Sequence, residues 1–263
     1  MRGWRAKIGV LVPEGNTTLE PELYALAPSG VTFHFARLQA GSQATTLEAI
    51  IRDYLASMPQ AAAAVAKADP AVIVFGLTAG SFMPESGGNT GIEATITACT
   101  GMPALATGTC VIDSLRALGI RRLLEVTPYT REVSALGQRS LETHGFQVAA
   151  LHTIPGIQGV RGIYQLHPQR VYQEVKTALR GQQVDGVFLS GTGVPSLEVL
   201  PVLEADLGLP VVSSTTAVMW RVLRHLSIAP RPDTGRLFAT ATEFPPPGAV
   251  AEAGGRGGGH VES

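Results

Sequence analysis

The sequence has few charged residues and no surplus of either sign. Lys, Arg, Asp and Glu make up 16% of the 263 residues, and the formal net charge is −1. A chain without a basic surplus gives no electrostatic reason to expect nucleic acid or an anionic membrane as a partner. Long apolar runs are also missing, because stretches such as 61–66 and 71–75 are far shorter than the roughly 20 residues that span a bilayer. We therefore expect neither a nucleic-acid partner nor a membrane partner.

Cysteine is scarce, and no group of residues has the spacing of a metal site. The two cysteines, Cys99 and Cys110, form no disulfide framework, and the six histidines show no metal-ligand pattern. The basic N-terminus is followed by an apolar segment of only residues 8–12, which is too short for the core of a signal peptide and is better explained as a first strand. We expect a cytoplasmic protein without a metal ion.

The C-terminal segment differs from the rest in composition. Residues 245–263 are rich in Pro and Gly and have no apolar period that could be buried. Such a composition is typical of disordered segments. We therefore predict a disordered tail over 245–263, and we expect His260 to be part of that tail and nothing more.

The remainder alternates short apolar strands with longer helical patterns, which is the signature of a parallel α/β sheet. Four strands are predicted in the first half, at 7–12, 31–35, 71–75 and 104–106, and four in the second half, at 122–127, 147–151, 185–189 and 211–213. Helices are predicted at 46–57, 60–67, 111–118, 132–144, 168–180, 197–207 and 217–226. The Gly191-Thr192-Gly193 stretch lacks the third glycine of a dinucleotide fingerprint, so we expect no cofactor.

The two halves also match each other in sequence. The matching pairs, in chain order, are Pro13 with Pro128, the turn at 77–78 with that at 191–192, and Pro103 with Pro210. Matches in order at nearly constant spacing indicate a duplicated half-domain, although any two strand–helix repeats offer some matches by chance. The predicted fold is α/β with two pseudo-symmetric half-domains, each a four-stranded parallel sheet flanked by helices, and an active-site cleft between them. We assign 1–112 plus 215–240 to the first half-domain and 113–214 to the second.

Two of the predicted strands end in turns of the same form. FGLTAGSF at 75–82 and FLSGTGVP at 188–195 pass from apolar into small and hydroxyl-bearing residues, whose backbone amides could hold an anion. Ligands of open α/β sheets lie at the carboxyl ends of the strands. Two facing turns would therefore enclose a small molecule with two carboxylates, or with one carboxylate and a developing enolate.

Four segments supply the candidate binding residues, and 213–216 is a lesser fifth. They are Asn16 and Thr17 after the first strand, Thr78 and Ala79 in the first turn, Tyr129 after Pro128, and Thr192 and Gly193 in the second turn. Asn16 and its neighbours could instead cap a helix, and Tyr129 could be a half-buried tyrosine at a turn. None of these groups titrates near neutrality without a large pKa shift.

Several motifs together resemble the maleate isomerase and arylmalonate decarboxylase family of the aspartate/glutamate racemase superfamily. They are VPEGNTTLEPEL, the LTAGS turn, ALGIRRLLEVTPYTREV, LSGTGVPSLEVLP and LGLPVVSSTTAVMW, and with GRLF they extend over about residues 7–238. The resemblance implies a cofactor-free enzyme with its site between two α/β halves. It also implies that carboxylates bind at Asn16, Thr17, Thr78, Tyr129 and Thr192.

The chain departs from this family at its cysteines. In the racemases and isomerases of the family a cysteine occupies each of the two turns, and the decarboxylases keep only the second one as a proton donor. Here these two catalytic positions hold Leu77 and Gly191. Isomerisation through a cysteine adduct and racemisation by two thiols should therefore be impossible. Cys99 and Cys110 fall outside the turns and are expected to be structural.

Three functional hypotheses remain open. The first is a cofactor-independent decarboxylase of a small malonate-like dicarboxylate, in which Leu77 desolvates the leaving carboxylate while Thr78 and Tyr129 help to hold the enediolate in a dioxyanion pocket. Its proton donor would be water, Tyr129 or a group not yet placed. The second is a maleate isomerase-like enzyme with non-thiol chemistry on a cis-diacid, which the segment at 16–18 favours. The third is a catalytically silent carboxylate-binding protein. Helix 171–179 could pair subunits in a homo-oligomer or face water.

Overall fold

The computed structural model describes residues 2–231 and 234–240. The tail predicted at 245–263, with His260, lies outside this part of the chain. The strands are β1 (Ala6–Pro13), β2 (Val31–Leu38), β3 (Val72–Phe75), β4 (Ala104–Ala106), β5 (Arg122–Thr127), β6 (Gln147–Thr153), β7 (Gly186–Leu189) and β8 (Val211–Ser213). Each of them overlaps one of the strands predicted from the sequence.

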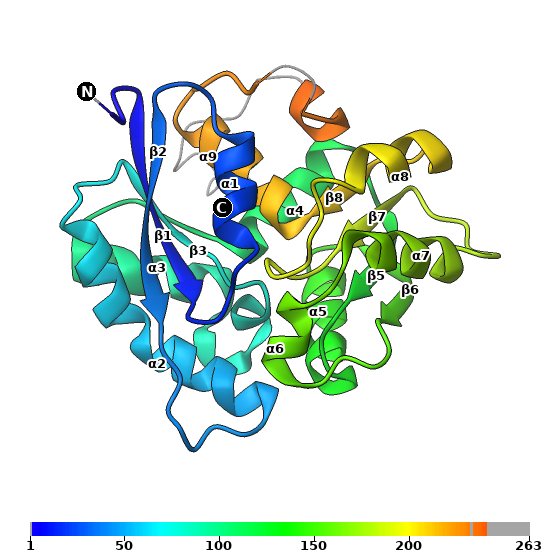
Figure 1. The fold of residues 1–263 in the computed structure, drawn as a ribbon, viewed down its shortest axis with the longest axis horizontal. Coiled ribbons are helices and arrows are strands. Elements are labelled where there is room, and N and C mark those ends of the chain that lie inside the picture. The colour runs from blue at the N-terminus through cyan, green and yellow to red at the C-terminus, as the bar shows by residue number, and fades with distance from the viewer. Residues whose placement is uncertain (1, 232–233, 241–263) are drawn as a thin grey trace, which may run out of the picture.

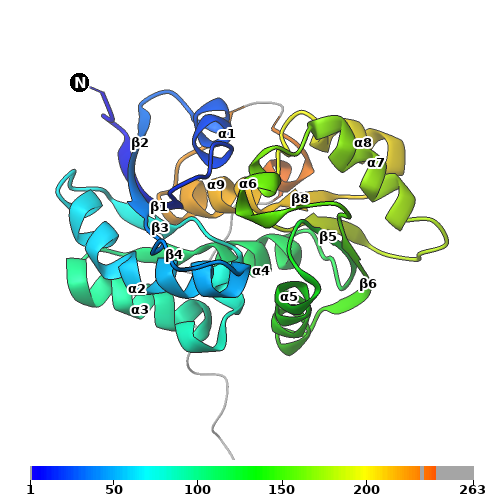
Figure 2. The same ribbon diagram turned by 60° about the horizontal axis from the view of Figure 1, so that its bottom comes forward.

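The strands form two parallel four-stranded sheets with the same topology. The first has the order β2-β1-β3-β4 and the second the order β6-β5-β7-β8. In Figure 1 the first sheet lies in the left half of the molecule and the second in the right half, and Figure 2 shows the same division from another side. Each strand of the first sheet therefore has a counterpart in the second: β1 corresponds to β5, β2 to β6, β3 to β7 and β4 to β8. This confirms the prediction of two pseudo-symmetric α/β halves.

Nine α-helices flank the sheets in the described residues. They are α1 (Leu19–Leu26), α2 (Leu47–Ala66), α3 (Gly88–Thr100), α4 (Thr107–Ala117), α5 (Arg131–Thr143), α6 (Gly159–Tyr164), α7 (Pro168–Ala178), α8 (Leu200–Leu207) and α9 (Ser214–His225). Short 3-10 turns lie at η1 (Ala79–Phe82), η2 (Pro84–Ser86) and η3 (Arg236–Ala239). None of these helices combines the length and the apolar character that crossing a membrane requires.

Three apolar cores hold these layers together. The outer face of the first sheet packs on α2 and α3, and that of the second packs on α7 and α8. The third core contains α1, α4 and α9 and joins the two sheets, with Val10 of β1 and Phe188 of β7 both buried in it. Figures 1 and 2 show α4 and α9 between the halves.

The helices differ from the prediction in four places. The patterns at 46–57 and 60–67 belong to one helix, α2, which runs through Pro59. Helix α1 was expected only as the helix that Asn16 and its neighbours could cap, without bounds. Helices α3 and α6 were not predicted, because α6 is short and α3 buries only Ile92 and Ile96 and so has a weak apolar stripe. The division of the chain at 112 and 214 stays a prediction.

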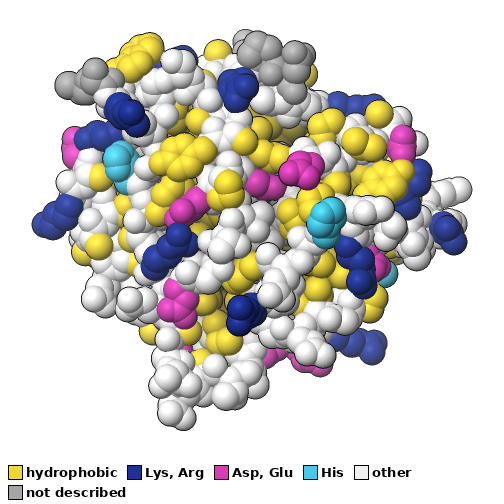
Figure 3. Space-filling model, viewed as in Figure 1, with side chains coloured by type: hydrophobic (Ala, Val, Ile, Leu, Met, Phe, Trp, Pro, Cys, Tyr) yellow, Lys and Arg dark blue, Asp and Glu magenta, His cyan; other side chains and the backbone are white. Residues whose placement is uncertain are grey.

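The surface carries both signs of charge without a single-sign patch on the face shown. Lys and Arg side chains alternate with Asp and Glu across it (Figure 3), as the formal net charge of −1 leads one to expect. The absence of a nucleic-acid partner, the cytoplasmic location and a homo-oligomer stay predictions.

Candidate active site

A small cavity lies where the two halves meet, at the carboxyl ends of their strands. It is lined by Pro13, Asn16, Leu47, Ile51, Tyr54, Leu77 and Ala79 of the first half, and by Tyr129, Val160, Ile163, Tyr164, Thr192 and Gly193 of the second. Six of the residues proposed from the sequence are therefore in its wall. Of the other three, Thr17 is exposed, and Thr78 and Gly191 belong to the turns behind the wall.

Asn16 both caps a helix and reaches across the cavity. Its Oδ1 accepts hydrogen bonds from the backbone N–H groups of Thr18 (2.9 Å) and Leu19 (3.0 Å) at the start of α1. Its Nδ2 donates to Oγ1 of Thr192 in the other half (3.3 Å). An amide nitrogen has two hydrogens, so one remains for a ligand. The capping and binding interpretations are thus compatible in this geometry.

The first turn leaves β3 at Gly76 and enters η1. A side chain on Gly76 would clash, because its Cβ would lie 2.7 Å from the Leu19 side chain and 2.8 Å from the Leu11 carbonyl oxygen. The first amides of a helix have no carbonyl partner within it. Leu77, Thr78 and Ala79 therefore present an amide-rich turn, with the Leu77 side chain in the cavity wall.

The second turn is tied to the first by two hydroxyl groups. Thr192 donates through Oγ1 to the carbonyl oxygen of Gly76 (2.9 Å). Ser214 Oγ, at the start of α9, accepts hydrogen bonds from Thr78 Oγ1 (2.9 Å) and from the Gly191 N–H (3.0 Å). Ser214 fixes both turns, yet the sequence placed it only in the lesser segment 213–216. Its position directly after the last strand was the available signal.

Gly191 has a backbone conformation that a side chain would strain. Its φ is +118°, and a Cβ built there would lie 3.0 Å from Tyr129 Oη and 3.3 Å from the Val194 side chain. The phenol oxygen of Tyr129 is thus the polar atom nearest to the place where a side chain at position 191 would project.

The tyrosines in the wall stay protonated at neutral pH. Burial raises the pKa of Tyr129 above its usual range, although hydrogen bonds to the Thr78 side chain and the Ala79 backbone oppose this shift. Burial also raises the pKa of Tyr54 to about 12 and that of Tyr164 further. Tyr129 can therefore donate a hydrogen bond to an anion held at the first turn.

Most of the remaining wall is apolar, and the cavity is nearly filled. Its volume is about 20 Å³, which is close to the room of one water molecule. The Tyr164 ring is part of this wall and packs against the backbone of Gly193 and of Gly15. A dicarboxylate would fit only after part of the wall had moved.

Neither cysteine is near this arrangement of groups. Cys99 is exposed on α3, and its thiol donates to the Ile96 carbonyl (3.3 Å). Cys110 is buried in α4, where burial raises the pKa of its thiol. Neither lines the cavity. The described part of the chain also contains no cluster of His, Cys, Asp and Glu suited to a metal ion.

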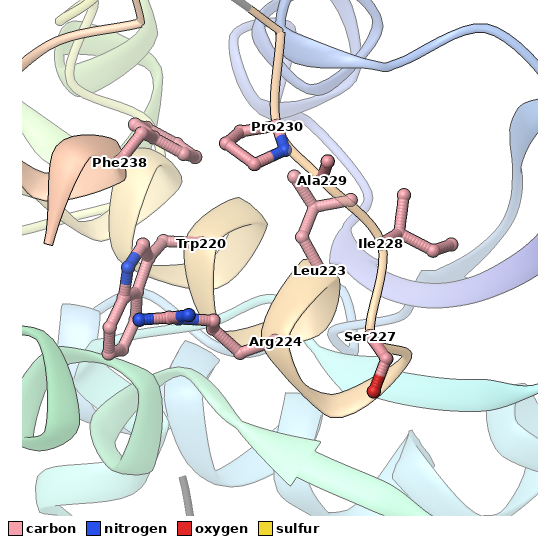
Figure 4. Close-up of a pocket in the computed structure, with 8 residues that line it drawn as sticks. All are labelled: Trp220, Leu223, Arg224, Ser227, Ile228, Ala229, Pro230 and Phe238. Carbon is pink, nitrogen blue, oxygen red and sulfur yellow. The ribbon is translucent and has the colours of Figure 1, made fainter. Parts of the chain in front are cut away.

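A second pocket, of about 300 Å³, lies at the far end of α9 (Figure 4). Its walls are mostly apolar, with Trp220, Leu223 and Phe238 among them, and the Arg224 guanidinium lies 5.5 Å from the Trp220 ring centre. At 1.5 Å per residue, Arg224 is about 15 Å along the helix from Ser214. This pocket is therefore separate from the two turns, and we assign no chemistry to it.

The fold and the cavity define a class: an α/β protein of two like halves with a cavity between two amide-rich turns. Residues 8–238 match the family model described as arylmalonate decarboxylase. The chain therefore belongs to the arylmalonate decarboxylase family, whose characterised relatives below are enzymes.

Relatives of two activities are similar to the chain. The arylmalonate decarboxylase of Bordetella bronchiseptica is 30% identical over 175 residues, which cover 65% of this chain and 72% of that protein. The maleate isomerase of Nocardia farcinica is 26% identical over 247 residues, covering 88% and 95%.

The solved structures of both activities share the fold. A crystal structure of arylmalonate decarboxylase has a TM-score of 0.74 at 27% identity and covers 89% of this chain and 99% of its own. A cysteine-to-alanine variant of the Pseudomonas putida S16 maleate isomerase, solved with maleate, has a TM-score of 0.78 at 22% identity, covering 89% and 98%. At this identity the second comparison shows the fold alone.

Proposed function

We propose that the chain is a cofactor-independent decarboxylase that acts on a small malonate-like dicarboxylate. The position of Leu77 is the main support for this proposal. Its side chain lines the cavity directly beside the amide-rich turn, so an apolar group stands next to a set of hydrogen-bond donors. Such an arrangement favours loss of CO₂, because it solvates a developing enediolate better than it solvates a second carboxylate.

The donors would hold the carboxylate that the substrate keeps. The backbone of Thr78 and Ala79, the free hydrogen of Asn16 Nδ2 and the phenol of Tyr129 can converge on its two oxygens. When the bond to the other carboxylate breaks, CO₂ leaves and the bonding electrons pass into the enediolate. A proton is then transferred to the carbon, and the Tyr129 hydroxyl is the donor that we favour, because its oxygen lies where a side chain at position 191 would project.

Thiol chemistry is not supported by this cavity. The Nocardia farcinica maleate isomerase has been solved as a cysteine-to-serine mutant with a covalently bound succinylcysteine intermediate. In the present chain no cysteine lines the cavity. Cys110 is buried, and the raised pKa of its thiol disfavours the nucleophilic thiolate.

An isomerase with non-thiol chemistry is the second candidate. The segment around Asn16 resembles the isomerases more than the decarboxylases, and the isomerase relative from Nocardia farcinica matches 88% of the chain. A silent carboxylate-binding protein is the third possibility, since the donors of the cavity could bind an anion without any reaction.

Incubation with a panel of diacids, followed by NMR, tests the proposal. We expect alkylmalonates and arylmalonates to lose CO₂, and Tyr129→Phe to slow this reaction about 100-fold, as the loss of a general acid does. Conversion of maleate to its trans isomer would favour the second candidate. Line broadening of the diacids without turnover would contradict both enzymatic candidates. A Cys99→Ser variant is the matched control and should retain full activity.

A further inference from the structure

The interior beside the cavity holds a carboxyl group that the proposed reaction has not used. Glu125 on β5 is 0% exposed, and neither of its carboxyl oxygens has a hydrogen-bond partner in the described part of the protein. The hydroxyl of Ser190, just before Gly191, is also buried without such a partner. Ser190 lies close enough to lower the pKa of Glu125, although the two groups make no hydrogen bond of good geometry. An uncompensated buried carboxylate would be costly, so the group is held as a neutral acid.

Among the residues that the structure describes, no Lys, Arg or His forms an ion pair with Glu125. A Cβ placed on Gly137 of α5 would lie 3.4 Å from Glu125 Oε1 and 2.8 Å from the Phe82 ring, so the carboxyl group lies against the backbone of α5. Its partners across the sheet are Leu151 of β6 and Phe188 of β7. The titratable groups of α5 are all exposed: Arg131, Glu132, Arg139 and Glu142. On β6 the titratable group is His152, which pairs with Glu174 of α7. Burial therefore raises the pKa of Glu125 to about 8.

Glu125 is connected to the cavity through Tyr129. Alternate residues of a strand share a face, so Glu125 and Thr127 follow each other toward Tyr129 at the end of β5. Thr127 Oγ1 accepts a hydrogen bond from the Tyr129 N–H (3.3 Å). The second turn supplies a further link, because Ser190 precedes Gly191, and a Cβ built on Gly191 would lie 3.0 Å from Tyr129 Oη. A charge on Glu125 also raises the pKa of the Tyr129 phenol by Coulomb repulsion. A buried titratable group thus lies on the same strand that leads to the phenol in the cavity wall.

We propose that Glu125 keeps Tyr129 supplied with a proton, and so takes over the part of the thiol that this chain lacks. The inference rests on the proposed decarboxylation. After CO₂ has left, the Tyr129 O–H bond breaks and its proton forms the new C–H bond of the product. The phenolate then takes the proton of the Glu125 carboxyl group, directly or by way of the Ser190 hydroxyl. The Glu125 carboxylate regains a proton from water once the product has gone. Glu125 does not touch the substrate and acts only through Tyr129. It is therefore a positioning residue for that phenol and not a catalytic residue.

The pH dependence of turnover tests this role, with Glu125→Gln as the variant. In the wild type we expect kcat to fall above about pH 8, because the ionised carboxyl group has no proton to return. In Glu125→Gln we expect kcat near pH 7 to fall about tenfold or more, with little change in KM, and the fall above pH 8 to disappear. Glu125→Asp should restore part of the rate. Glu93→Gln is the matched control, because Glu93 is also a carboxyl group whose pKa burial raises but it bonds Ala106 and Thr109 instead.

Infrared spectroscopy separates this inference from the proposed function. The carbonyl stretch of a protonated acid should be present in the wild type at pH 7, titrate near pH 8 and be absent from Glu125→Gln. Turnover that keeps the wild-type rate and pH profile in Glu125→Gln would overturn the inference alone, as would absence of this band. A wild type with the band but without turnover of any diacid would instead overturn the proposed function, and the inference with it.

Discussion

At the scale of single residues, Gly191 decides what the second turn can do. Its φ of +118° and the 3.0 Å between a built Cβ and Tyr129 Oη leave no place for a side chain. A thiol at this position, where the family resemblance implies one, would therefore strain the turn. With hydrogen alone at position 191, the Tyr129 phenol oxygen lies where a side chain would project.

We expect Gly191→Ala and Gly191→Cys to destabilise the protein alike, by about 1–3 kcal/mol, because both must adopt a conformation that only glycine tolerates. The free energy of unfolding in urea measures this. Gly208→Ala is the matched control: Gly208 also has a positive φ, of +68°, but a Cβ there would meet nothing within 4 Å. We expect Gly208→Ala to lose less free energy of unfolding than the Gly191 variants. The Gly208→Ala loss reports backbone strain alone, and the excess at Gly191 reports the contact with Tyr129. A Gly191→Cys variant as stable as the wild type would show that the turn can rearrange.

The sequence located the polar residues at strand ends better than the polar residue within a strand. Asn16, Tyr129 and Thr192 follow strand ends, where position in an α/β sheet alone indicates a ligand, and all three line the cavity. Glu125 lies in the middle of a strand, where a single charged letter gives no sign that it faces the interior. Thr17 follows a strand end as well, but the turn directs it to solvent.

At the scale of elements, α6 supplies one side of the cavity wall, through Val160, Ile163 and Tyr164. This helix has six residues and lies between the two halves in Figures 1 and 2. Its last residue, Tyr164, packs on Gly193 of its own half and on Gly15 of the other. So short a helix has too little apolar period to be predicted from sequence, whereas the strands, with their buried apolar runs, were all predicted.

Tyr164→Ala should open the cavity. We expect the variant to raise kcat/KM for arylmalonates relative to small alkylmalonates by about tenfold, because binding no longer requires a large ring to be displaced. Competition assays with paired substrates measure the ratio. Tyr172→Ala is a suitable control, since Tyr172 lies on α7 and bonds Asp206 outside the cavity. An unchanged ratio would indicate that α6 does not limit entry.

At the scale of the whole molecule, the buried carboxyl groups couple the fold to pH. Glu22 of α1 accepts hydrogen bonds from the N–H groups of Ser196 (2.6 Å) and Leu197 (3.0 Å) and so connects the two halves. Burial raises its pKa, as it raises that of Glu125. Both carboxyl groups therefore bind a proton more tightly in the folded state than in the unfolded chain.

The stability of the protein should therefore fall with rising pH. For Glu125 the pKa is about 8 when folded and 4.5 in the ordinary state. Its contribution is fully present below 4.5 and is lost as the pH rises to about 8, on the order of a few kcal/mol. Urea unfolding of the wild type and of Glu125→Gln between pH 5 and pH 9 measures the difference. Glu85→Gln, at an exposed site, should leave the slope unchanged. Equal slopes in wild type and Glu125→Gln would mean that Glu125 is already ionised at pH 5.

The two turns correspond in position but not in side chain, because Leu77 carries an isobutyl group where Gly191 carries only hydrogen. A flat intermediate held between them would meet hydrocarbon on one face and the Tyr129 hydroxyl on the other. A proton from Tyr129 would then reach a prochiral carbon from one side only. The broken symmetry of a duplicated fold would in this way set the handedness of the product.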